Sequence, residues 1–370
     1  MTGIKHFLQS EIVLVIAFGA AFLSMFFVHP TREYITYIDF RTLSLLFCLM
    51  LTVSGLKSTG IFDALAISII PHFKNARALC LVLTLMCFFT SMFITNDVAL
   101  ITFVPFTIIL YTASGLMDRL IYTAVLETVA ANLGSMLTPF GNPQNLYLYS
   151  YFHISPGDFF RITLPVVSIG LVFLSFASLF CKKQPVSMKP EERNVNISKK
   201  NLLLYVILFI LCLLSVFYVI DYRLMVLIVC LVFLFADWKL ILHTDYGLLL
   251  TFVCFFIFAG NAGRIGAVHT VLSSLIKRHE LLSGVLLSQV ISNVPAAVLL
   301  SAFTNNYKAL LLGTNIGGLG TLIASLASLI SFKFYVRTEN ARPLRYLGIF
   351  TVLNLVLLLP VLVLSMVFLP

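Results

Sequence analysis

Residues 94–97 read ITND and residues 291–294 read ISNV, and each of these polar breaks interrupts a long apolar run. Each is followed by a second break rich in Asn and Gly, NLGSMLTPFGNPQN over residues 132–145 and NIGGLGT over residues 315–321. Lipid cannot hydrogen-bond to irregular backbone, so such breaks persist at membrane depth only where they line a protein cavity. Matched interrupted segments in two halves of a chain indicate the binding site of a secondary transporter.

The two sets of breaks match each other residue by residue. ITNDVALITF aligns with ISNVPAAVLL, and NLGSMLT aligns with NIGGLGT. The equivalent residues are Thr95 and Ser292, Asn96 and Asn293, Asn132 and Asn315, Gly134 and Gly317, and Thr138 and Thr321. We therefore expect an all-α polytopic membrane protein with two inverted-topology repeats, each containing a re-entrant hairpin and a discontinuous helix.

Composition agrees with a membrane protein. Hydrophobic residues make up 60% of the 370 residues, charged residues 11%, and the mean hydropathy is +1.04. These values exclude a soluble domain. The net charge of +9 comes from Lys and Arg in short loops between apolar runs, so we expect no nucleic-acid partner. The cysteines lie in or beside apolar runs without a CxxC pair, which favours packing over metal or disulfide roles: Cys48, Cys80, Cys87, Cys181, Cys212, Cys230 and Cys254.

The apolar runs predict about nine spanning helices and two hairpins, since a span needs roughly 17–25 residues. The expected hairpins are 78–112 and 281–304, the broken helices are 120–150 and 306–332, and the continuous spans are 12–28, 42–56, 162–181, 201–220, 224–236, 246–262 and 346–369. Whether the short run 224–236 crosses fully stays open. Residues 61–73 and 265–276 are amphipathic, which predicts interfacial helices.

A basic segment divides the chain. Residues 182–200 predict a cytoplasmic linker between a first repeat, residues 1–181, and a second repeat, residues 201–370. With a cytoplasmic N-terminus, about two thirds of the 24 Lys and Arg residues fall on the inner side, as the positive-inside rule requires. Five crossings separate the hairpins, and this odd number places them on opposite faces. The C-terminus is then outside.

The breaks offer ligands for small ions. Side-chain amides, hydroxyls and carbonyls at helix ends suit a hard cation, whereas helix N-termini suit an anion. We expect one cation site per repeat and an anion between the tips; the alternative is a set of capped helix kinks. The candidate substrate ligands are Thr95, Asn96, Asn142, Ser292, Asn293 and Thr321, and the candidate cation ligands are Asn96, Asp97, Asn132, Gly134, Gly141, Asn293, Asn315, Gly317 and Gly318.

Two acids lie inside apolar runs. An ionisable group at this depth costs at least ~2.5–3.5 kcal/mol, which makes Asp97 and Glu127 candidate coupling residues. Three roles are open for Asp97: cation ligand, proton carrier, or N-cap of the second hairpin helix. Glu127 has two, a proton carrier or an internal pair with a hydroxyl or amide. Sodium ions or protons are the expected coupling ions, with no transition metal and no cofactor.

NLGSMLTPFGNPQN, SQVISNVPAAVLL and NIGGLGTLIASLASL resemble the ion transporter superfamily of divalent anion–sodium symporters, citrate-type permeases and arsenite permeases, and most closely its small bacterial anion permeases. The resemblance covers nearly the whole chain. It implies inverted repeats, elevator-type alternating access, a homodimer and a multi-pass protein of the bacterial inner membrane.

The third residue of each tip departs from the dicarboxylate members, which carry Ser-Asn-Thr. Here the tips end in Asp97 and Val294. A negative Asp97 opposes a dicarboxylate by Coulomb repulsion unless a cation or proton intervenes, and the Asn-Asp pair is more similar to arsenite permeases. The resemblance thus implies a cation-coupled transporter of a di- or tricarboxylate or an inorganic oxyanion. The alternative is a metalloid exporter or a cation/proton antiporter that titrates Asp97. The sequence has no HExxH, GxSxG, paired intramembrane aspartates or His cluster, so we expect no enzyme.

Overall fold

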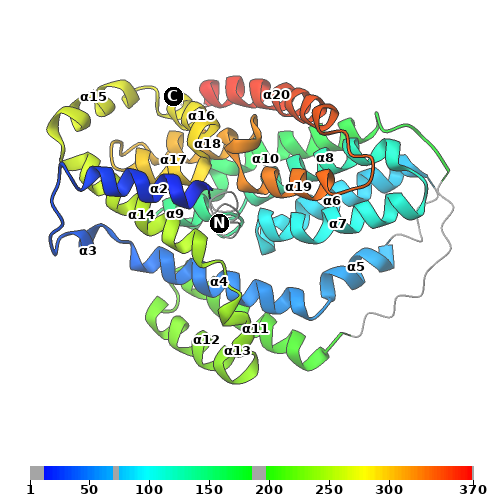
Figure 1. Ribbon diagram of the computed structural model, residues 1–370, viewed down its shortest axis with the longest axis horizontal. Coiled ribbons are helices and arrows are strands. Elements are labelled where there is room, and N and C mark those ends of the chain that lie inside the picture. Colours follow the sequence, from blue (N-terminus) through cyan, green and yellow to red (C-terminus); the bar gives the residue numbers. More distant parts are fainter. Residues whose placement is uncertain (1–11, 70–74, 186–196, 369–370) are drawn as a thin grey trace, which may run out of the picture.

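Figure 1 shows the computed structural model, which describes residues 12–69, 75–185 and 197–368. Within these ranges the regular elements are helices. They are α2 (Ile12–Ser24), α3 (Tyr34–Tyr37), α4 (Phe40–Ser58), α5 (Ile61–Ile69), α6 (Ala76–Ile94), α7 (Asn96–Ala113), α8 (Met117–Ser135), α9 (Pro143–Tyr151), α10 (Pro156–Ser178), α11 (Lys199–Val216), α12 (Tyr222–Ala236), α13 (Trp238–Leu242), α14 (Tyr246–Arg264), α15 (Gly266–Ile276), α16 (Glu280–Ile291), α17 (Asn293–Ser301), α18 (Tyr307–Gly317), the 3₁₀ turn η2 (Leu322–Ala324), α19 (Leu326–Val336) and α20 (Pro343–Phe368).

Seven of the described helices are long and apolar enough to cross a membrane: α4, α6, α7, α10, α11, α14 and α20. Five of them coincide with predicted continuous spans, and α6 and α7 are the arms of the first predicted hairpin. The helices in the predicted spans 12–28 and 224–236 are shorter, with 13 residues in α2 and 15 in α12. The prediction of an all-α polytopic membrane protein is confirmed.

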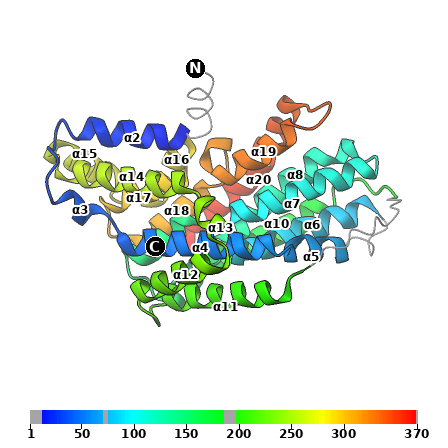
Figure 2. The same cartoon turned by 60° about the horizontal axis from the view of Figure 1, so that its bottom comes forward.

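The first interrupted segment folds back on itself at Thr95. Figures 1 and 2 show α6 and α7 side by side, with both free ends at the right of the molecule. Thr107 and Tyr111 on α7 hydrogen-bond to Glu127 and Thr123 on α8, so α7 runs antiparallel to α8. The predicted hairpin is therefore present, with its tip pointing toward the middle of the molecule.

The second interrupted segment is also a hairpin. The hydroxyl of Thr304, just after α17, donates to the carboxylate of Glu280, the first residue of α16, so the two free ends lie together. In Figures 1 and 2 this hairpin extends to the left, opposite to the first, and the two tips face each other near the middle. The opposed directions agree with the parity of the predicted crossings.

Each hairpin packs against a broken helix of its own repeat. In the first repeat α8 and α9 flank the break at residues 136–142, and in the second α18 and α19 flank residues 318–325, which include η2. The first break was expected to begin at Asn132. Instead the backbone stays helical to Ser135, so Asn132 and Gly134 belong to the last turn of α8.

Two contacts recur at equivalent positions in both repeats. A Cβ on Gly134 would lie 2.4 Å from Oγ of Ser91, and a Cβ on Gly317 would lie 2.6 Å from Oγ of Ser288. The hydroxyl of Thr138 donates to the carbonyl of Met92 (2.7 Å), and that of Thr321 donates to the carbonyl of Gln289 (3.2 Å). Hairpin and broken helix thus pack in the same way in both halves, as expected of internal repeats.

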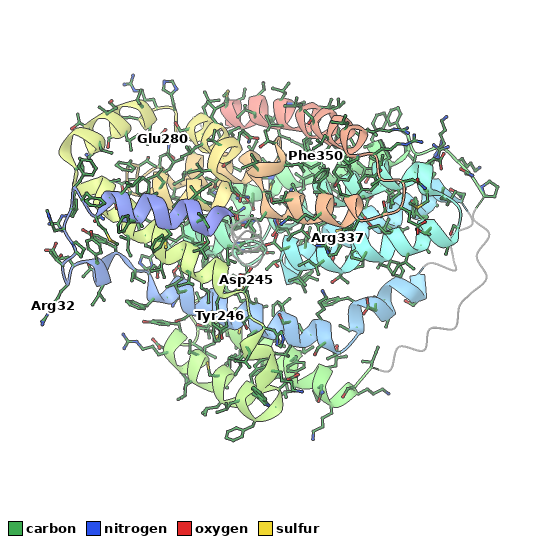
Figure 3. The ribbon with its side chains drawn as sticks, viewed as in Figure 1. Arg32, Asp245, Tyr246, Glu280, Arg337 and Phe350 are labelled. Atoms are coloured by element: carbon green, nitrogen blue, oxygen red, sulfur yellow. The ribbon has the colours of Figure 1, made fainter. Side chains whose placement is uncertain are left out.

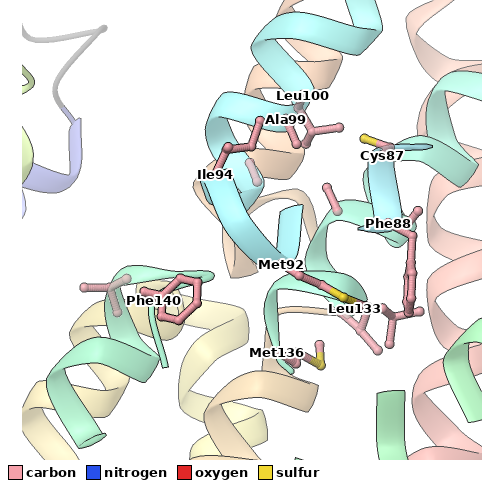
Figure 4. Close-up of a cluster of buried hydrophobic side chains, with 14 of the residues drawn as sticks. Cys87, Phe88, Met92, Ile94, Ala99, Leu100, Leu133, Met136 and Phe140 are labelled. Atoms are coloured by element: carbon pink, nitrogen blue, oxygen red, sulfur yellow. The ribbon is translucent and has the colours of Figure 1, made fainter. Parts of the chain in front are cut away.

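Apolar packing fixes the first hairpin to the broken helix. Figure 4 shows Met92 of the hairpin near Leu133 and Met136 around the end of α8, with Leu100 further along the hairpin in the same apolar cluster. Leu100 and Leu133 have no exposed surface. Because interiors pack at crystal-like density, this cluster holds the polar tip in register with the polar break.

A second group of helices lies along one side of the hairpin body. Figure 1 shows α4, α11, α12 and α13 below the hairpins, with α14 alongside α2. Tyr205 of α11 stacks on Phe233 of α12 (5.3 Å between ring centroids) and covers Gly55 of α4. The amphipathic segments form α5 and α15, although the predicted end of the first, residues 70–73, lies outside the described residues. So does most of the predicted linker, residues 186–196.

Candidate functional site

The first hairpin tip is bonded directly to the first helix break. Thr95 has a positive φ of 72°, which lets the chain end α6 and start α7 within one residue. The backbone N–H of Asn96 donates to the carbonyl of Gly141 (3.1 Å), and its side-chain amide donates to Oδ1 of Asn132 (3.2 Å). A non-glycine residue with positive φ is strained, and such strain concentrates at functional sites.

The second tip has the same backbone geometry. Ser292 has a φ of 76°, and α17 begins at the next residue, Asn293. The hydroxyl of Ser292 donates to the carbonyl of Ala324 (3.4 Å). The side-chain amide of Asn293 faces Gly318, where a Cβ would lie 3.0 Å from its nitrogen. Each tip asparagine therefore faces the break of its own repeat, as the sequence predicts.

Two glycines of the first repeat are required by close backbone approach. A Cβ on Gly134 would lie 2.0 Å from the carbonyl oxygen of Phe88, and one on Gly141 would lie 2.2 Å from that of Ser135. Real Cβ contacts are never this short, so these positions exclude any other residue without movement of the backbone. The role of both glycines is steric. The close approach at Gly141 lets its carbonyl reach the backbone N–H of Asn96 at the tip.

Asparagines from the two breaks bind one another across the repeats. The amide of Asn142 donates to Oδ1 of Asn315 (3.3 Å), and the amide of Asn315 donates to Oδ1 of Asn145 (2.6 Å). Asn132 accepts from the hydroxyl of Ser325 (3.0 Å) and donates to that of Ser328 (3.1 Å). These side chains are buried, and they join the two predicted half-sites into one polar junction, which we call the central junction.

Helix ends of both polarities meet at the central junction. The N-termini of α7, α9 and α17 start at Asn96, Pro143 and Asn293, and the C-termini of α6, α8, α16 and α18 end beside them. A helix N-terminus carries about half a positive charge and a C-terminus about half a negative charge. The junction therefore offers N–H groups to an anion and carbonyls to cations.

Two oxygen atoms at the first tip have no partner. Oδ1 of Asn96 and Oδ1 of Asp97 are buried without a hydrogen bond from the described residues. Buried polar atoms are nearly always satisfied, so each orphan atom calls for an explanation such as an ion. Both are oxygen ligands of the kind that hard cations prefer.

Asp97 is not the N-cap of α7. The cap position belongs to Thr95, and Asp97 is the second residue of the helix, where its negative charge faces the positive helix end. The N-cap alternative for Asp97 is therefore wrong. Asp245, the N-cap of α14, also lies near the middle of the molecule (Figure 3).

Glu127 lies apart from the tips, fully buried between α7 and α8. The hydroxyl of Thr107 donates to its Oε1 (2.5 Å), and its Oε2 has no partner among the described residues. The internal pair with a hydroxyl, one of the two alternatives for Glu127, is thus present. One carboxylate oxygen still remains unused.

Thr321 differs from the other candidate residues. It is exposed, and both its backbone N–H and its hydroxyl are bonded to Gln289, so it closes the edge of the second break. The sequence reasoning missed four residues that the structure brings to the site: Asn145, Gln289, Ser325 and Ser328. Ser325 and Ser328 are spaced by three residues at the start of α19, a pattern that places both hydroxyls on one helix face.

Comparison with known proteins agrees with this geometry. The model of a family described as citrate transporter matches residues 9–307. The chain belongs to this family. It is 31% identical to an uncharacterized transporter of Methanocaldococcus jannaschii, over 94% of this chain and 95% of that protein. It is 29% identical to the inner membrane protein YbiR of Escherichia coli, over 87% and 86% of the two chains.

A shorter match is found in a plant protein. The chain is 29% identical to the silicon efflux transporter LSI3 of Oryza sativa, over 41% of this chain and 31% of that protein. The family is described as citrate transporter, and two of these relatives are named as transporters. The protein is accordingly a multi-pass membrane transporter of the citrate or anion permease type, and not an enzyme.

Proposed function

We propose that this protein is a secondary active transporter of a small anion. The gradient of a coupling cation drives the transport. The observation that carries the proposal is the central junction, where Asn96 and Asn293 begin two opposed helices. Two helix N-termini that face one small volume from opposite sides form an anion site without a basic side chain. The anion class is a di- or tricarboxylate or an inorganic oxyanion.

The coupling cation binds the oxygen atoms of each half-site. In the first repeat Oδ1 of Asn96 and Oδ1 of Asp97 have no hydrogen-bond partner among the described residues, and the backbone N–H of Asn96 donates to the carbonyl of Gly141. In the second repeat Asn293 lies against Gly318. The carbonyl of Gly317 accepts a hydrogen bond from the side-chain amide of Gln289 (2.7 Å). A cation at Asp97 also removes the repulsion between this carboxylate and an anionic substrate. Sodium fits this ligand set, and a proton on Asp97 is the other candidate.

Alternating access moves the hairpin body past the second helix group. The hairpins and broken helices are linked through buried hydrogen bonds, whereas α4, α11 and α12 pack together beside them. This division supports an elevator-type motion in which the junction crosses the membrane with the hairpins. We also propose a homodimer in a bacterial inner membrane, with the N-terminus cytoplasmic and the C-terminus outside.

One observation favours a second candidate. Only the first tip has an acidic third residue, Asp97, because Val294 stands at the equivalent place in the second. An unsymmetrical, negatively charged site suits an uncharged metalloid hydroxide or a cation better than a dianion, and one partial relative is named a silicon efflux transporter. The second candidate is therefore a metalloid exporter or cation/proton antiporter that uses Asp97.

Transport by purified protein in liposomes separates the two candidates. Uptake of a panel of carboxylates and oxyanions is measured with and without an inward sodium gradient, and with the pH gradient set independently. Anion uptake that is faster with the cation gradient supports the first candidate. Transport of an uncharged metalloid hydroxide, without movement of any anion in the panel, supports the second.

A further inference from the structure

A cavity with a basic lining lies away from the residues of the central junction. It has a volume of about 660 Å³ and lies between the α7–α8 turn and the α19–α20 turn. Two helices end there, α7 at Ala113 and α19 at Val336, and two begin there, α8 at Met117 and α20 at Pro343. The cavity therefore lies at one end of the helical body, where the candidate membrane spans α7 and α20 also have one end.

Three arginines of the second repeat line this cavity. Arg337, Arg342 and Arg345 are exposed, and none makes an ion pair within 4.0 Å among the described residues. Of the two acids in the lining, Asp118 is paired with Arg119 (3.0 Å), which leaves Glu339. The lining of the cavity thus carries a net positive charge.

The same cavity has an apolar part, which we call the apolar wall. It includes Pro105, Ile109 and Met117 of the first repeat and Phe334 of α19, while Thr112 and Asp118 are the polar residues that the first repeat adds to the lining. Ile109 is 50% exposed, and Leu344, next to the arginine cluster, is 85% exposed. An arginine rim above an apolar wall is complementary to a molecule with a phosphate group at one end and hydrocarbon at the other.

We propose that this cavity binds an anionic phospholipid, with its phosphate between Arg337, Arg342 and Arg345 and an acyl chain along Ile109 and Met117. Guanidinium groups bind phosphate oxygens in bidentate geometry. Basic pockets between the ends of membrane helices are sites of this kind. The bound lipid bridges the first hairpin (α7) and the last helices of the second repeat (α19 and α20).

The apolar wall is the reason to choose a lipid over a soluble phosphate. A free phosphate ion uses the arginines alone and gains nothing from Ile109, Met117 or Phe334. A phosphatidylglycerol or cardiolipin molecule uses both walls, and it is already concentrated in the bilayer next to the cavity.

The test measures lipid binding to the purified full-length protein by native mass spectrometry and by its thermal unfolding midpoint in detergent. The test variant is Arg337→Gln/Arg342→Gln/Arg345→Gln. The matched control is Arg32→Gln/Arg161→Gln/Arg223→Gln, which removes three exposed arginines from other parts of the surface. Figure 3 shows Arg32 and Arg337 at well separated places on the molecule.

We expect phosphatidylglycerol to bind the wild-type protein and the control variant, and to raise their unfolding midpoint more than phosphatidylcholine does. The test variant is expected to bind it at least about tenfold more weakly, since each arginine near an anionic surface contributes a few-fold. The thermal unfolding midpoint of the test variant in phosphatidylcholine is expected to equal that of the wild type. Equal midpoints would show that the test variant is folded. A second variant, Ile109→Ser/Met117→Ser, is expected to weaken lipid binding without affecting inorganic phosphate.

Three results would overturn the proposal. The first is equal binding of phosphatidylglycerol by the test variant and the control variant. The second is stabilisation by inorganic phosphate alone that matches the effect of the lipid, which would assign the cavity to a soluble anion. The third is no preference of the wild type for phosphatidylglycerol over phosphatidylcholine.

Discussion

The side-chain amide of Asn142 donates a hydrogen bond to Oδ1 of Asn315, over 3.3 Å, and so joins the helix break of the first repeat to that of the second. Asn315 in turn donates to Asn145 (2.6 Å). The first tip binds the last turn of α8 through Asn96 and Asn132, and the second tip binds the second break through Ser292 and the carbonyl of Ala324. These buried hydrogen bonds hold the two hairpins in a fixed relative position.

The tip asparagines are expected to serve ligands more than stability. Asn96→Ala and Asn293→Ala should each reduce transport at least about tenfold, because a hydrogen bond to a charged group contributes ~1.5–3 kcal/mol. The unfolding midpoint of Asn96→Ala should fall only modestly, since the change removes one internal side-chain bond, to Oδ1 of Asn132 (3.2 Å), and that oxygen still accepts from Ser325 (3.0 Å). Uptake into liposomes and thermal unfolding check both parts. Asn305→Ala, at an exposed position, is the control. Near-normal uptake by both tip variants would remove them from the site.

Asp97→Asn tests the coupling ion. If Asp97 binds the coupling cation, the amide keeps an oxygen ligand but loses the charge, so a higher sodium concentration is needed for half-maximal transport. We expect this result. Loss of the pH dependence with sodium dependence intact would instead make Asp97 the proton carrier. Transport rates titrated against sodium and pH, for wild type and variant, distinguish the two. An unchanged profile in both titrations would leave Asp97 without a role.

Glu127→Gln tests the buried acid between α7 and α8. Gln retains an oxygen that accepts from Thr107, so we expect the fold and the sodium dependence to be unchanged. Loss of the titratable group should flatten the pH profile of transport if Glu127 carries a proton, as we expect from its unused Oε2. A pH profile identical to that of the wild type would restrict Glu127 to its hydrogen bond with Thr107.

Gly134→Ala tests the close packing of hairpin and broken helix. The added Cβ would meet the carbonyl oxygen of Phe88 at 2.0 Å, and this backbone atom cannot rotate away. We expect destabilisation of about 1–3 kcal/mol or more, with loss of transport. Gly317→Ala should cost less, because its nearest contact is the side chain of Ser288. Gly348→Ala, which meets nothing within 4 Å, is the control for both in thermal unfolding. Equal stability of the Gly134 and Gly348 variants would refute the steric role.

Much of this arrangement is readable from the sequence because lipid leaves the backbone few choices. Breaks such as 94–97 and 291–294 are tolerated only at a cavity, and their duplication predicts the repeats and the opposed hairpins. The same motifs name Asn96 and Asn132 as candidate ligands, and the structure joins these two side chains by a hydrogen bond. These predictions concern local pattern and topology.

Contacts between the repeats could not be read in this way. Asn142 and Asn145 bind Asn315, and Asn132 binds Ser325, across more than 150 positions of sequence. Such distances depend on how the two halves dock, which hydrophobic periodicity does not encode. Gln289 was missed because its partners are backbone carbonyls, such as that of Gly317 (2.7 Å), which leave no residue pattern in the sequence. From the sequence alone, a polar residue at position 289 is equally compatible with exposure to water.

The most direct test of the central claim is anion uptake into liposomes by the wild type, Asn96→Ala and Asn293→Ala, with and without an inward sodium gradient and with pH set separately. One anion site shared by both tips predicts that a small carboxylate or oxyanion enters faster with the cation gradient. It also predicts that either variant alone abolishes this uptake. Anion transport that survives the loss of one tip asparagine and depends only on the other would contradict a shared site.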